Sequence, residues 1–420
     1  GKDLTPMGAE MAGNADGTIP AWDGGLTGAL PGWPNKLNNR PNPYADDKVL
    51  FTITAENVDK YADKLPEGVE AMFKAYPEAF KMNVYQTRRS AAAPQYVYDN
   101  TKANATSAKI TEDGYGVSGA WGGIPFPIPQ SGVEAIWNHM LRFNGVMREA
   151  RVFESTVYGK SRSDMGFAIE VHHTYYDQNA DPKHQKDGVI FLYNNTYTAP
   201  ARLAGDGILA IENINPVKNP RKAWTYDPGE RRVRRAPNLA FDTPDRAMVV
   251  FDDFDSYSGS PERYNWKLVG KQEMYVPYNN NELNAPGLDP DKVLTPGYMN
   301  SDLIRYELHR VWVVEATLRD DKRHIFAKRN FYIDEDSWAI LFTEKYDGNG
   351  DLWRVTFNYP MNAPEVPLFG GGGRATVDLK KNGYYILDFP FGKDSVGWQF
   401  DAPVRDGKYY TPAALRRRGR

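Results

Sequence analysis

The residues of this chain whose types could do chemistry are six histidines and many acidic side chains. The histidines are His139, His172, His173, His184, His309 and His324. No two of them lie four positions apart on a predicted helix beside an acid, so the spacing of a helical zinc site is missing. A cluster brought together from distant parts of the chain stays open. The sequence itself predicts no metal and no cofactor.

The carboxylates show no spacing that is typical of catalysis. Asp252, Asp253 and Asp255 are crowded, and we interpret such crowding as solvated charge unless a pocket is present. A pair of acids of the glycosidase kind stays open. No Gly-x-Ser-x-Gly nucleophile elbow occurs, and the lack of cysteine excludes thiolate nucleophiles, thiolate metal ligands and disulfides. We therefore predict no catalytic residues and expect a protein that is not an enzyme.

Two glycine-rich stretches are similar to ligand-binding loops. The run 370–373 lacks the Lys-Ser/Thr of a phosphate loop and follows no strand-to-helix pattern. The run 347–351 starts like a calcium loop, but Leu352 stands at the position of the loop glycine and Asn358 at that of the final glutamate. A hairpin turn is the better interpretation of 347–351, because Gly and Asn tolerate the positive φ of a tight turn.

A short basic segment contains Arg231, Arg232, Arg234 and Arg235. Nucleic-acid binding is disfavoured, because the segment has no interleaved aromatic residues and the net charge of the chain is −3. We expect a strand that faces solvent after the turn at 227–229. Contact with an anionic lipid headgroup or another partner is the alternative.

Among the elements that could position functional side chains, the stretch 305–359 is predicted to be a β-meander. Apolar and polar residues alternate in it with a period of two, which places them on opposite faces of a strand. In its first run the apolar set is Tyr306, Leu308, Trp312, Val314, Ala316 and Leu318. In its third run the set is Trp338, Ile340, Phe342 and Tyr346. Such an aromatic face packs a core or lines a cavity.

The other segments are predicted from turn residues, caps and periodicity. Residues 1–50 form an irregular arm that is held by its aromatic side chains. Helices are expected at 55–64, from Pro66 onward, at 94–108 and at 131–143. Strands are expected at 146–158, 165–177, 188–197, 207–214, 222–228, 231–236, 246–252 and 265–277. A long loop at 279–303, a flexible joint at 369–374 and a frayed basic tail complete the chain.

These elements predict an α+β fold that is mostly β, with a large sheet covered by helices. We expect 1–420 to be a single large domain with four parts. They are an arm (1–50), a mainly helical lid (51–145), an antiparallel sheet (146–368), and a Gly-rich joint with the last strands and the basic tail (369–420). No apolar run reaches the roughly 18 to 20 residues of a membrane-spanning helix. The polar start without Met is consistent with an exported protein whose signal peptide has been removed, or with a boundary of another origin.

Several motifs resemble one family. They are LTPMGAEMAGNADGTIPAWDGG at 4–25, PFPIP at 125–129, WNH at 137–139, RRAP at 234–237, YVPYN at 275–279 and RYELHRVWVVEA at 305–316. Together they resemble domain of unknown function family 1329. The segment 224–237 and the hairpin order in 323–357 are similar to the outer-membrane lipoprotein-sorting proteins LolA and LolB.

This resemblance implies a curved antiparallel sheet, the LolA/LolB-like open half-barrel. It also implies an exported periplasmic protein of Gram-negative bacteria, either free in the periplasm or associated with the outer membrane. The resemblance further suggests transport of a lipid or another hydrophobic molecule between inner and outer membrane. The implied partners are an inner-membrane resistance-nodulation-division exporter and an outer-membrane protein. An envelope scaffold or adaptor, or an envelope glycan or lipid hydrolase, are the alternatives.

The ligand-binding residues are predicted from aromatic and apolar positions of the expected strands. They are Trp224, Tyr226, Trp266, Trp312, Val314, Trp338, Phe342 and Phe357. Apolar ligand surface that these side chains cover would contribute roughly 25 cal/mol per Å² to binding. The alternative is that the same rings form a solid core.

Overall fold

The computed structural model describes residues 3–236, 242–246 and 248–418. Its largest element is a sheet that holds sixteen strands within these residues. In chain order they are β1 (Phe51–Ile53), β2 (Met82–Val84), β5 (Met147–Tyr158), β6 (Ser161–His172), β7 (Val189–Ala199), β8 (Gly207–Asn213), β9 (Lys222–Asp227), β10 (Arg232–Arg235), β13 (Tyr264–Pro277), β14 (Arg305–Leu318), β15 (Lys328–Asp334), β16 (Ile340–Tyr346), β17 (Leu352–Asn358), β20 (Arg374–Asp378), β21 (Gly383–Phe389) and β22 (Val396–Gln399).

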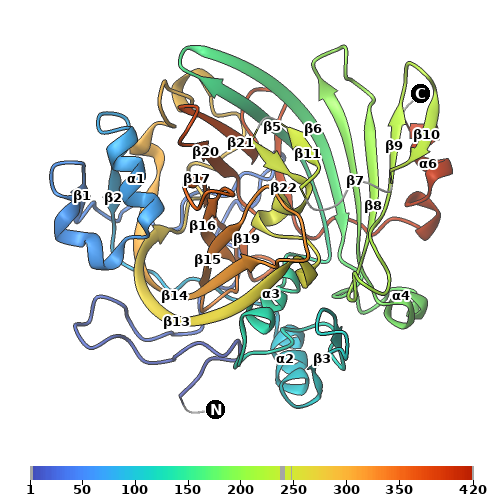
Figure 1. The fold of residues 1–420 in the computed structure, drawn as a ribbon, viewed down its shortest axis with the longest axis horizontal. Coiled ribbons are helices and arrows are strands. Elements are labelled where there is room, and N and C mark those ends of the chain that lie inside the picture. The colour runs from blue at the N-terminus through green and yellow to red at the C-terminus, as the bar shows by residue number, and fades with distance from the viewer. Residues whose placement is uncertain (1–2, 237–241, 247, 419–420) are drawn as a thin grey trace.

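The sheet is a single curved layer that does not close on itself. Its strand order is β1-β2-β14-β15-β16-β17-β20-β21-β5-β6-β7-β8-β9-β10, with β13 beside β14 and β22 beside β5. Figure 1 shows it as an arch that runs from β13 and β14 at the lower left, over β5 and β6 at the top, to β9 and β10 at the right. The predicted fold, mostly β with a large open sheet, is confirmed.

The sequence analysis expected an antiparallel sheet, but one pair of strands in the sheet is parallel. The short strand β2 runs parallel to β14, with Asn83 opposite Arg305 and Val84 opposite Tyr306. Strands from 51–53 and from 374–399 also belong to the sheet, so it extends beyond the expected range 146–368. Within the described ranges, three small two-stranded sheets lie outside it. They are β3 (Lys109–Ile110) with β4 (Val117–Ser118), β11 (Pro244–Arg246) with β12 (Val249–Val250), and β18 (Met361–Ala363) with β19 (Leu368–Gly370).

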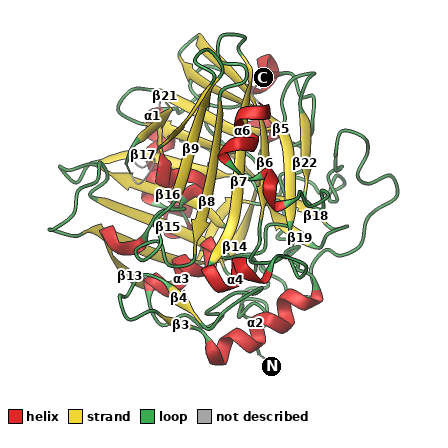
Figure 2. Ribbon diagram, turned by 90° about the vertical axis from the view of Figure 1, so that its right-hand side faces the viewer, coloured by secondary structure: helices red, strands yellow, loops and turns green. Residues whose placement is uncertain are grey.

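The helices are short, and α2, α3 and α4 lie at the open side of the arch, with α1 and α6 on its two flanks (Figure 1). The α-helices are α1 (Glu67–Ala75), α2 (Gln95–Ser107), α3 (Gly132–Met140), α4 (Pro182–Asp187), α5 (Pro290–Val293) and α6 (Pro412–Arg418). The 3-10 helices are η1 (Val58–Lys64), η2 (Phe251–Ser256), η3 (Pro261–Arg263), η4 (Ser301–Leu303) and η5 (Gly407–Tyr409). Figure 2 shows α2, α3 and α4 together at one end of the strands.

The helices expected near 66, 94–108 and 131–143 are confirmed, and two local predictions are wrong. The helix expected at 55–64 is instead the 3-10 helix η1, and the residues expected to begin it, 55–57, form a turn. Residues 249–250 are a short strand, but residues 251 and 252 of the expected strand 246–252 belong to the 3-10 helix η2. That conformation is incompatible with an extended strand.

The meander of β14 to β17 is confirmed, and so is the hairpin turn at 347–351, where Gly350 has a φ of 85°. The expected common face of Trp338, Ile340 and Phe342 is wrong. A β-bulge places Tyr332 opposite Phe342 but Ile333 opposite Ile340, so β16 carries one extra residue there. A bulge reverses the alternation of the side chains after it. Ile340 therefore packs with Trp338, while Phe342 packs in a different cluster.

The arm is held to the body of the protein, as expected. Met7 and Ile19 are buried, Trp22 Nε1 donates to the carbonyl of Ala91 at 3.2 Å, and Arg40 binds Glu365. The loop at 279–303 is not an open lid. Its asparagines act as backbone partners: Asn280 both donates to the carbonyl of Arg305 (3.1 Å) and accepts from its N–H (2.9 Å).

The C-terminal part also differs from the expectation. Residues 412–418 form α6, which packs Leu415 on the outer face of β8, β9 and β10 instead of fraying. The glycines at 370–373 serve close packing. A Cβ on Gly372 would lie 1.8 Å from the carbonyl oxygen of Tyr359, so no larger residue fits. Within the described residues, no helix has both the length and the apolar composition needed to cross a membrane.

Candidate functional site

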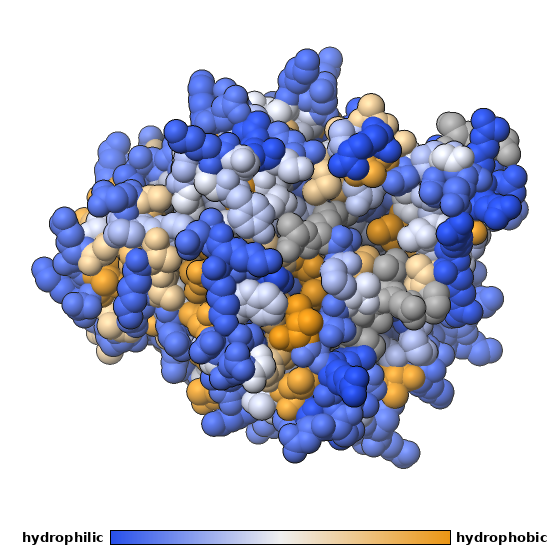
Figure 3. All heavy atoms as spheres, turned by 45° about the horizontal axis from the view of Figure 1, so that its top comes forward, coloured by the Kyte–Doolittle hydropathy of each residue, from blue (hydrophilic) through white to orange (hydrophobic). Residues whose placement is uncertain are grey.

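A cavity of about 280 Å³ lies in the half of the arch that is formed by β5 to β9. One wall consists of apolar side chains from β6, β7 and β8, namely Ile169, Val171, Ile190, Phe191, Ile208 and Ala210. The volume is close to the lower end of the roughly 300–1,000 Å³ range of small-molecule sites. In the space-filling view of Figure 3, hydrophobic side chains are exposed near the middle of one face, between hydrophilic ones.

Strand register explains why these side chains share one wall. Val171 lies opposite Tyr193, Tyr193 opposite Ala210, and Ala210 opposite Ala223. Residues directly opposite each other in a sheet point to the same face. A row of four side chains therefore crosses β6 to β9 on the cavity side, and Arg148 of β5 extends the row because it lies opposite Val171.

The opposite wall comes from α3 and from the segment 251–260. Trp137 and Met140 of α3 reach the cavity, together with Phe251, Phe254 and Tyr257. Ser131 caps α3 by accepting from the N–H of Glu134 at 3.3 Å, which is the capping pattern seen in the sequence. The first turn of α3 lies against β13, where a Cβ on Gly132 would meet the backbone of Lys267 at 2.8 Å.

His139 fixes this wall in place. Its Nε2 lies 2.8 Å from the carbonyl oxygen of Asp255, so Nε2 carries the proton and Nδ1 accepts from the N–H of Ile340 at 3.2 Å. Burial lowers the pKa of His139 to about 3, so the ring is neutral at physiological pH. The same helix turn holds Asn138, which donates to and accepts from the backbone of Phe126 at 2.6 and 2.9 Å. In the WNH motif, Asn138 and His139 therefore hold α3 to neighbouring segments, and Trp137 lines the cavity.

Charged groups line part of the cavity, and most of them are paired. Arg142 donates to Asp255 at 2.7 Å. The same kind of pairing joins Arg221 to Glu212 and Arg374 to Asp388. Burial raises the pKa of Asp255, but the guanidinium of Arg142 outweighs it and holds this pKa well below its ordinary value. Asp255 is therefore ionised, and all three carboxylates bind an arginine, which favours binding over acid–base catalysis.

The fourth arginine of the lining is Arg148. It has no carboxylate within ion-pair distance among the described residues, and its Nε has no hydrogen-bond partner there. Asn144, with its amide oxygen turned toward the arginines, accepts from Nη1 of Arg148 at 3.1 Å and from Nη2 of Arg142 at 3.2 Å. The guanidinium of Arg148 also lies 5.1 Å from the ring centroid of Trp398.

The eight residues predicted to bind a ligand are divided among three hydrophobic clusters. Trp224 and Tyr226 lie under α6 on the face of β9 opposite to Ala223. Trp266, Trp312, Val314 and Trp338 pack with Ala135 and Ile136 of α3. Phe342 and Phe357 pack with α1. The structure does not bring the eight together, and none of them belongs to the lining of this cavity. Their role in ligand binding stays a prediction.

The sequence analysis missed the residues that do line the cavity. The signal for them is the alternation in the predicted strands 165–177 and 188–197. Ile169 and Val171 share one face of the first strand, and Phe191 and Tyr193 share one face of the second. The sequence did not show which face of these strands lines the cavity. The interpretation of Asp252 and Asp253 as solvated charge is wrong: both are buried and bind Arg329, at 2.9 and 2.5 Å.

Two other predictions concern the basic strand and the histidines. The four arginines at 231–235 are exposed on and beside β10, as expected for a strand that faces solvent. His172 and His173 point to opposite faces of the sheet. His172 binds Asp177 at 2.8 Å, while His173 lines the cavity.

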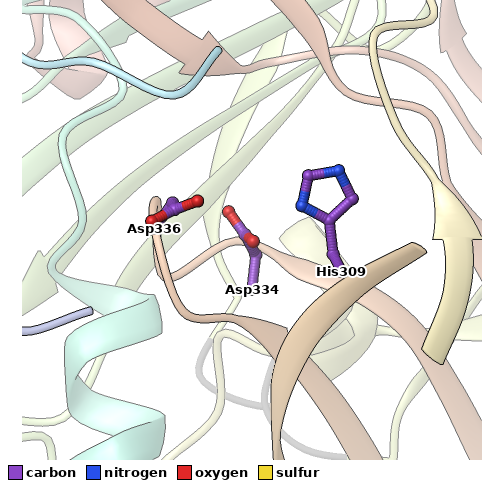
Figure 4. Close-up of side chains that lie close together, drawn as sticks. All are labelled: His309, Asp334 and Asp336. Atoms are coloured by element: carbon purple, nitrogen blue, oxygen red, sulfur yellow. The ribbon is translucent and has the colours of Figure 1, made fainter. Parts of the chain in front are cut away.

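A second cluster, His309, Asp334 and Asp336, has the residue types of a metal site. Figure 4 shows Asp334 between the other two side chains, and their candidate ligand atoms lie within 4.8 Å of one another. However, Arg89 donates to both oxygens of Asp336, at 2.7 and 2.9 Å. His309 uses Nε2 to contact Glu307 at 3.0 Å. A cation would sit beside the guanidinium of Arg89, so this geometry does not favour a metal ion.

The cluster instead holds a carboxyl group without a full set of partners. Asp334 Oδ2 accepts from the N–H of Ser337 at 2.9 Å, but Oδ1 has no hydrogen-bond partner among the described residues. Burial, helped by the neighbouring carboxylate of Asp336, raises the pKa of Asp334 to about 7. Asp334 is therefore partly protonated near neutral pH.

Solved structures with a similar arrangement have low sequence identity. One is a domain of a putative outer membrane lipoprotein-sorting protein from Vibrio parahaemolyticus, with a TM-score of 0.47, 13% identity and coverage of 68% of this chain and 98% of that one. Another is a DUF1329 family protein from Desulfovibrio piger, with a TM-score of 0.44, 14% identity and coverage of 65% and 92%. A third is a LolA superfamily protein, NE2245 from Nitrosomonas europaea, with a TM-score of 0.38, 12% identity and coverage of 65% and 93%.

The sequence comparisons are more specific. An uncharacterized protein of Pseudomonas aeruginosa, PA3922, is 43% identical over 427 aligned residues, which cover 100% of this chain and 92% of the relative. The family model described as protein of unknown function (DUF1329) matches residues 52–416. This chain therefore belongs to the DUF1329 family.

Proposed function

We propose that this protein is a periplasmic carrier that binds one hydrophobic molecule or lipid in the cavity of β5 to β9 and transfers it between the inner and the outer membrane. The observation that carries the proposal is the cavity itself, whose walls are apolar on β6 to β8 and on the segment 251–260. Each 100 Å² of apolar ligand surface removed from water contributes roughly 2.5 kcal/mol. The periplasmic location and the exporter and outer-membrane partners are part of the proposal.

The arrangement of charges supports a carrier over a hydrolase. Acid–base hydrolysis needs a carboxyl group that can exchange a proton near the substrate. In the cavity, Asp255 and Asp388 are each bound by an arginine, and Glu154 accepts from the hydroxyl of Tyr385. An envelope scaffold, the other alternative, has no specific observation in its favour.

The first test is extraction of the purified protein with organic solvent, followed by mass spectrometry of the extract. We expect a hydrophobic small molecule in stoichiometric amount. The second test is titration of ligand-stripped protein with dodecanol by calorimetry. Ala210→Trp should abolish this binding, because Ala210 lies on the cavity wall and an indole there would fill the space.

Ala201→Trp is the matched control, because Ala201 is exposed in the turn after β7. It should bind dodecanol like the wild type. An empty extract together with no dodecanol binding by the wild type would contradict the proposal. Equal binding by Ala210→Trp and the wild type would show that the ligand does not use this cavity.

A further inference from the structure

Among the described residues, one arginine at the polar end of the cavity makes no ion pair with a carboxylate. Of the four arginines in the lining, Arg142, Arg221 and Arg374 each bind a carboxylate. Arg148 binds none among the described residues. Glu154 also lines the cavity, but it lies six positions along β5 from Arg148, which places their Cα atoms about 20 Å apart. It cannot neutralise Arg148.

A second polar group without a partner lies beside Arg148. His173 is on the same face of the sheet, because its N–H donates to the carbonyl of Val146 at 2.8 Å while Arg148 lies opposite Val171. Its Nε2 is buried and has no hydrogen-bond partner among the described residues. Burial holds the pKa of His173 well below its ordinary value, so the ring is neutral and can offer one N–H.

These two groups are held in place from behind. The amide oxygen of Asn144 accepts from Nη1 of Arg148, and the Trp398 ring lies against the guanidinium. In these contacts Nη2 takes no part, and the buried Nε has no hydrogen-bond partner among the described residues. A guanidinium with N–H groups available in one plane is suited to an oxyanion, which it can bind through two hydrogen bonds. An unpaired buried charge is unfavourable, so an anion at this position would be stabilised.

We infer that Arg148 and His173 bind the anionic group of an amphiphilic ligand whose apolar part lies along β6 to β8. This inference rests on the proposed carrier function and narrows its ligand class. The apolar wall begins at Val171, directly opposite Arg148, so a single molecule can contact both. The anion can be a carboxylate or a phosphate, because both offer oxygens in the geometry that a guanidinium recognises.

The test is a calorimetric titration of ligand-stripped protein with four probes that share one alkyl chain, each below its micelle concentration. The probes are dodecanoate, dodecyl phosphate, dodecanol and dodecyltrimethylammonium. At least one anion should bind about 10- to 100-fold more tightly than dodecanol, the gain expected for charge-assisted hydrogen bonds. The cation should bind most weakly. The relative affinities of the two anions distinguish a carboxylate from a phosphate ligand.

Variants locate the effect. Arg148→Met keeps the apolar stem and should bind the anions no more tightly than it binds dodecanol. Arg148→Lys should recover part of the preference, because lysine supplies charge without the planar fork. Arg232→Met is the matched control, since Arg232 is exposed on β10, and it should behave as the wild type. Melting temperatures of all variants show whether each is folded.

The outcomes separate the two proposals. If dodecanol binds and no anion binds more tightly, the inference about Arg148 is wrong and the carrier proposal stands. The same conclusion follows if Arg148→Met keeps the preference for anions. If none of the four probes binds the wild type, both proposals fail. If Arg148→Met does not fold, the comparison of Arg148→Lys with the wild type and the order of the four probes on the wild type decide the matter.

Discussion

The two halves of the arch are built from the same kind of strand but differ in what covers them. In the half of β13 to β17, both faces are packed: Trp338 and Val314 lie against α3, and Phe342 and Phe357 lie against α1. In the half of β5 to β10, α6 covers the outer face of β8 to β10, while the inner face of β5 to β9 borders the cavity. α3 lies between the halves, with Ile136 toward the filled one and Trp137 toward the cavity.

This difference shows that an aromatic face does not by itself indicate a ligand site. The filled half has the larger share of the aromatic residues that were predicted to bind a ligand, yet protein covers them. The cavity in the other half is lined by aliphatic, aromatic and charged side chains, and among the described residues no carboxylate pairs with Arg148. Space for a ligand is left where no helix or loop packs closely against the sheet. It does not depend on which strands contain the most aromatic residues.

The largest effect should come from Trp338→Ala in the filled half. The Trp338 side chain is fully buried, and its Nε1 donates to the carbonyl of Met7 at 2.9 Å. Truncation of a buried tryptophan costs about 3–5 kcal/mol of the free energy of unfolding, which chemical denaturation measures. Trp312→Ala is the control: Trp312 stacks on Trp338 but is half exposed, so the loss should be smaller. Unchanged stability with a loss of dodecanol binding would instead place Trp338 in a ligand site.

Asp334→Asn should change how stability depends on pH. The folded-state pKa of Asp334 is raised to about 7 from 3.8, so the folded protein retains this proton over a range in which the unfolded chain releases it. The contribution is fully present below 3.8 and is lost as pH rises toward 7, by about 1.4 kcal/mol per pH unit. Asp334→Asn has no titrating carboxyl group at this position, so its stability does not fall in this way as the pH rises. Denaturation of both proteins at the two ends of the range should show the wild type losing stability relative to the variant; parallel pH profiles would contradict the prediction.

Phe254→Ala tests the half with the cavity. Phe254 is half buried at the edge of the cavity, so its removal should cost about 1 kcal/mol, less than a core substitution. Dodecanol should nevertheless bind more weakly, because part of the apolar wall is gone. Calorimetry and denaturation on the same preparation measure both quantities. A stability loss as large as that of Trp338→Ala would mean that both halves are solid core.

The smallest effect should come from Arg234→Ala on β10. Arg234 pairs only with Glu230 among the described residues, and both side chains are exposed. Such a pair contributes about 0–1 kcal/mol, so the melting temperature and ligand binding should both stay close to those of the wild type. A clear loss of dodecanoate binding would show that the basic strand takes part in ligand recognition.

Local features of the fold were predictable because neighbouring residues decide them. The turn at 347–351, the cap at Ser131 and the meander all follow from residue types within a few positions. The bulge at 340–342 was not predictable, because it depends on pairing with β15. The cavity was not predictable either. Val171 and Trp224 both lie on alternating strands, and only the position of α6 shows which face is covered.

The sequence by itself determined the family, the mostly β composition and the strands that build the arch, because periodicity, turn residues and motifs are written in consecutive positions. Only the tertiary structure decided that α3 packs against one half and borders a cavity in the other, and that no carboxylate in the described part of the chain pairs with Arg148. Those properties depend on contacts between residues more than a hundred positions apart, such as His139 with Ile340 and with Asp255. No local pattern specifies such contacts.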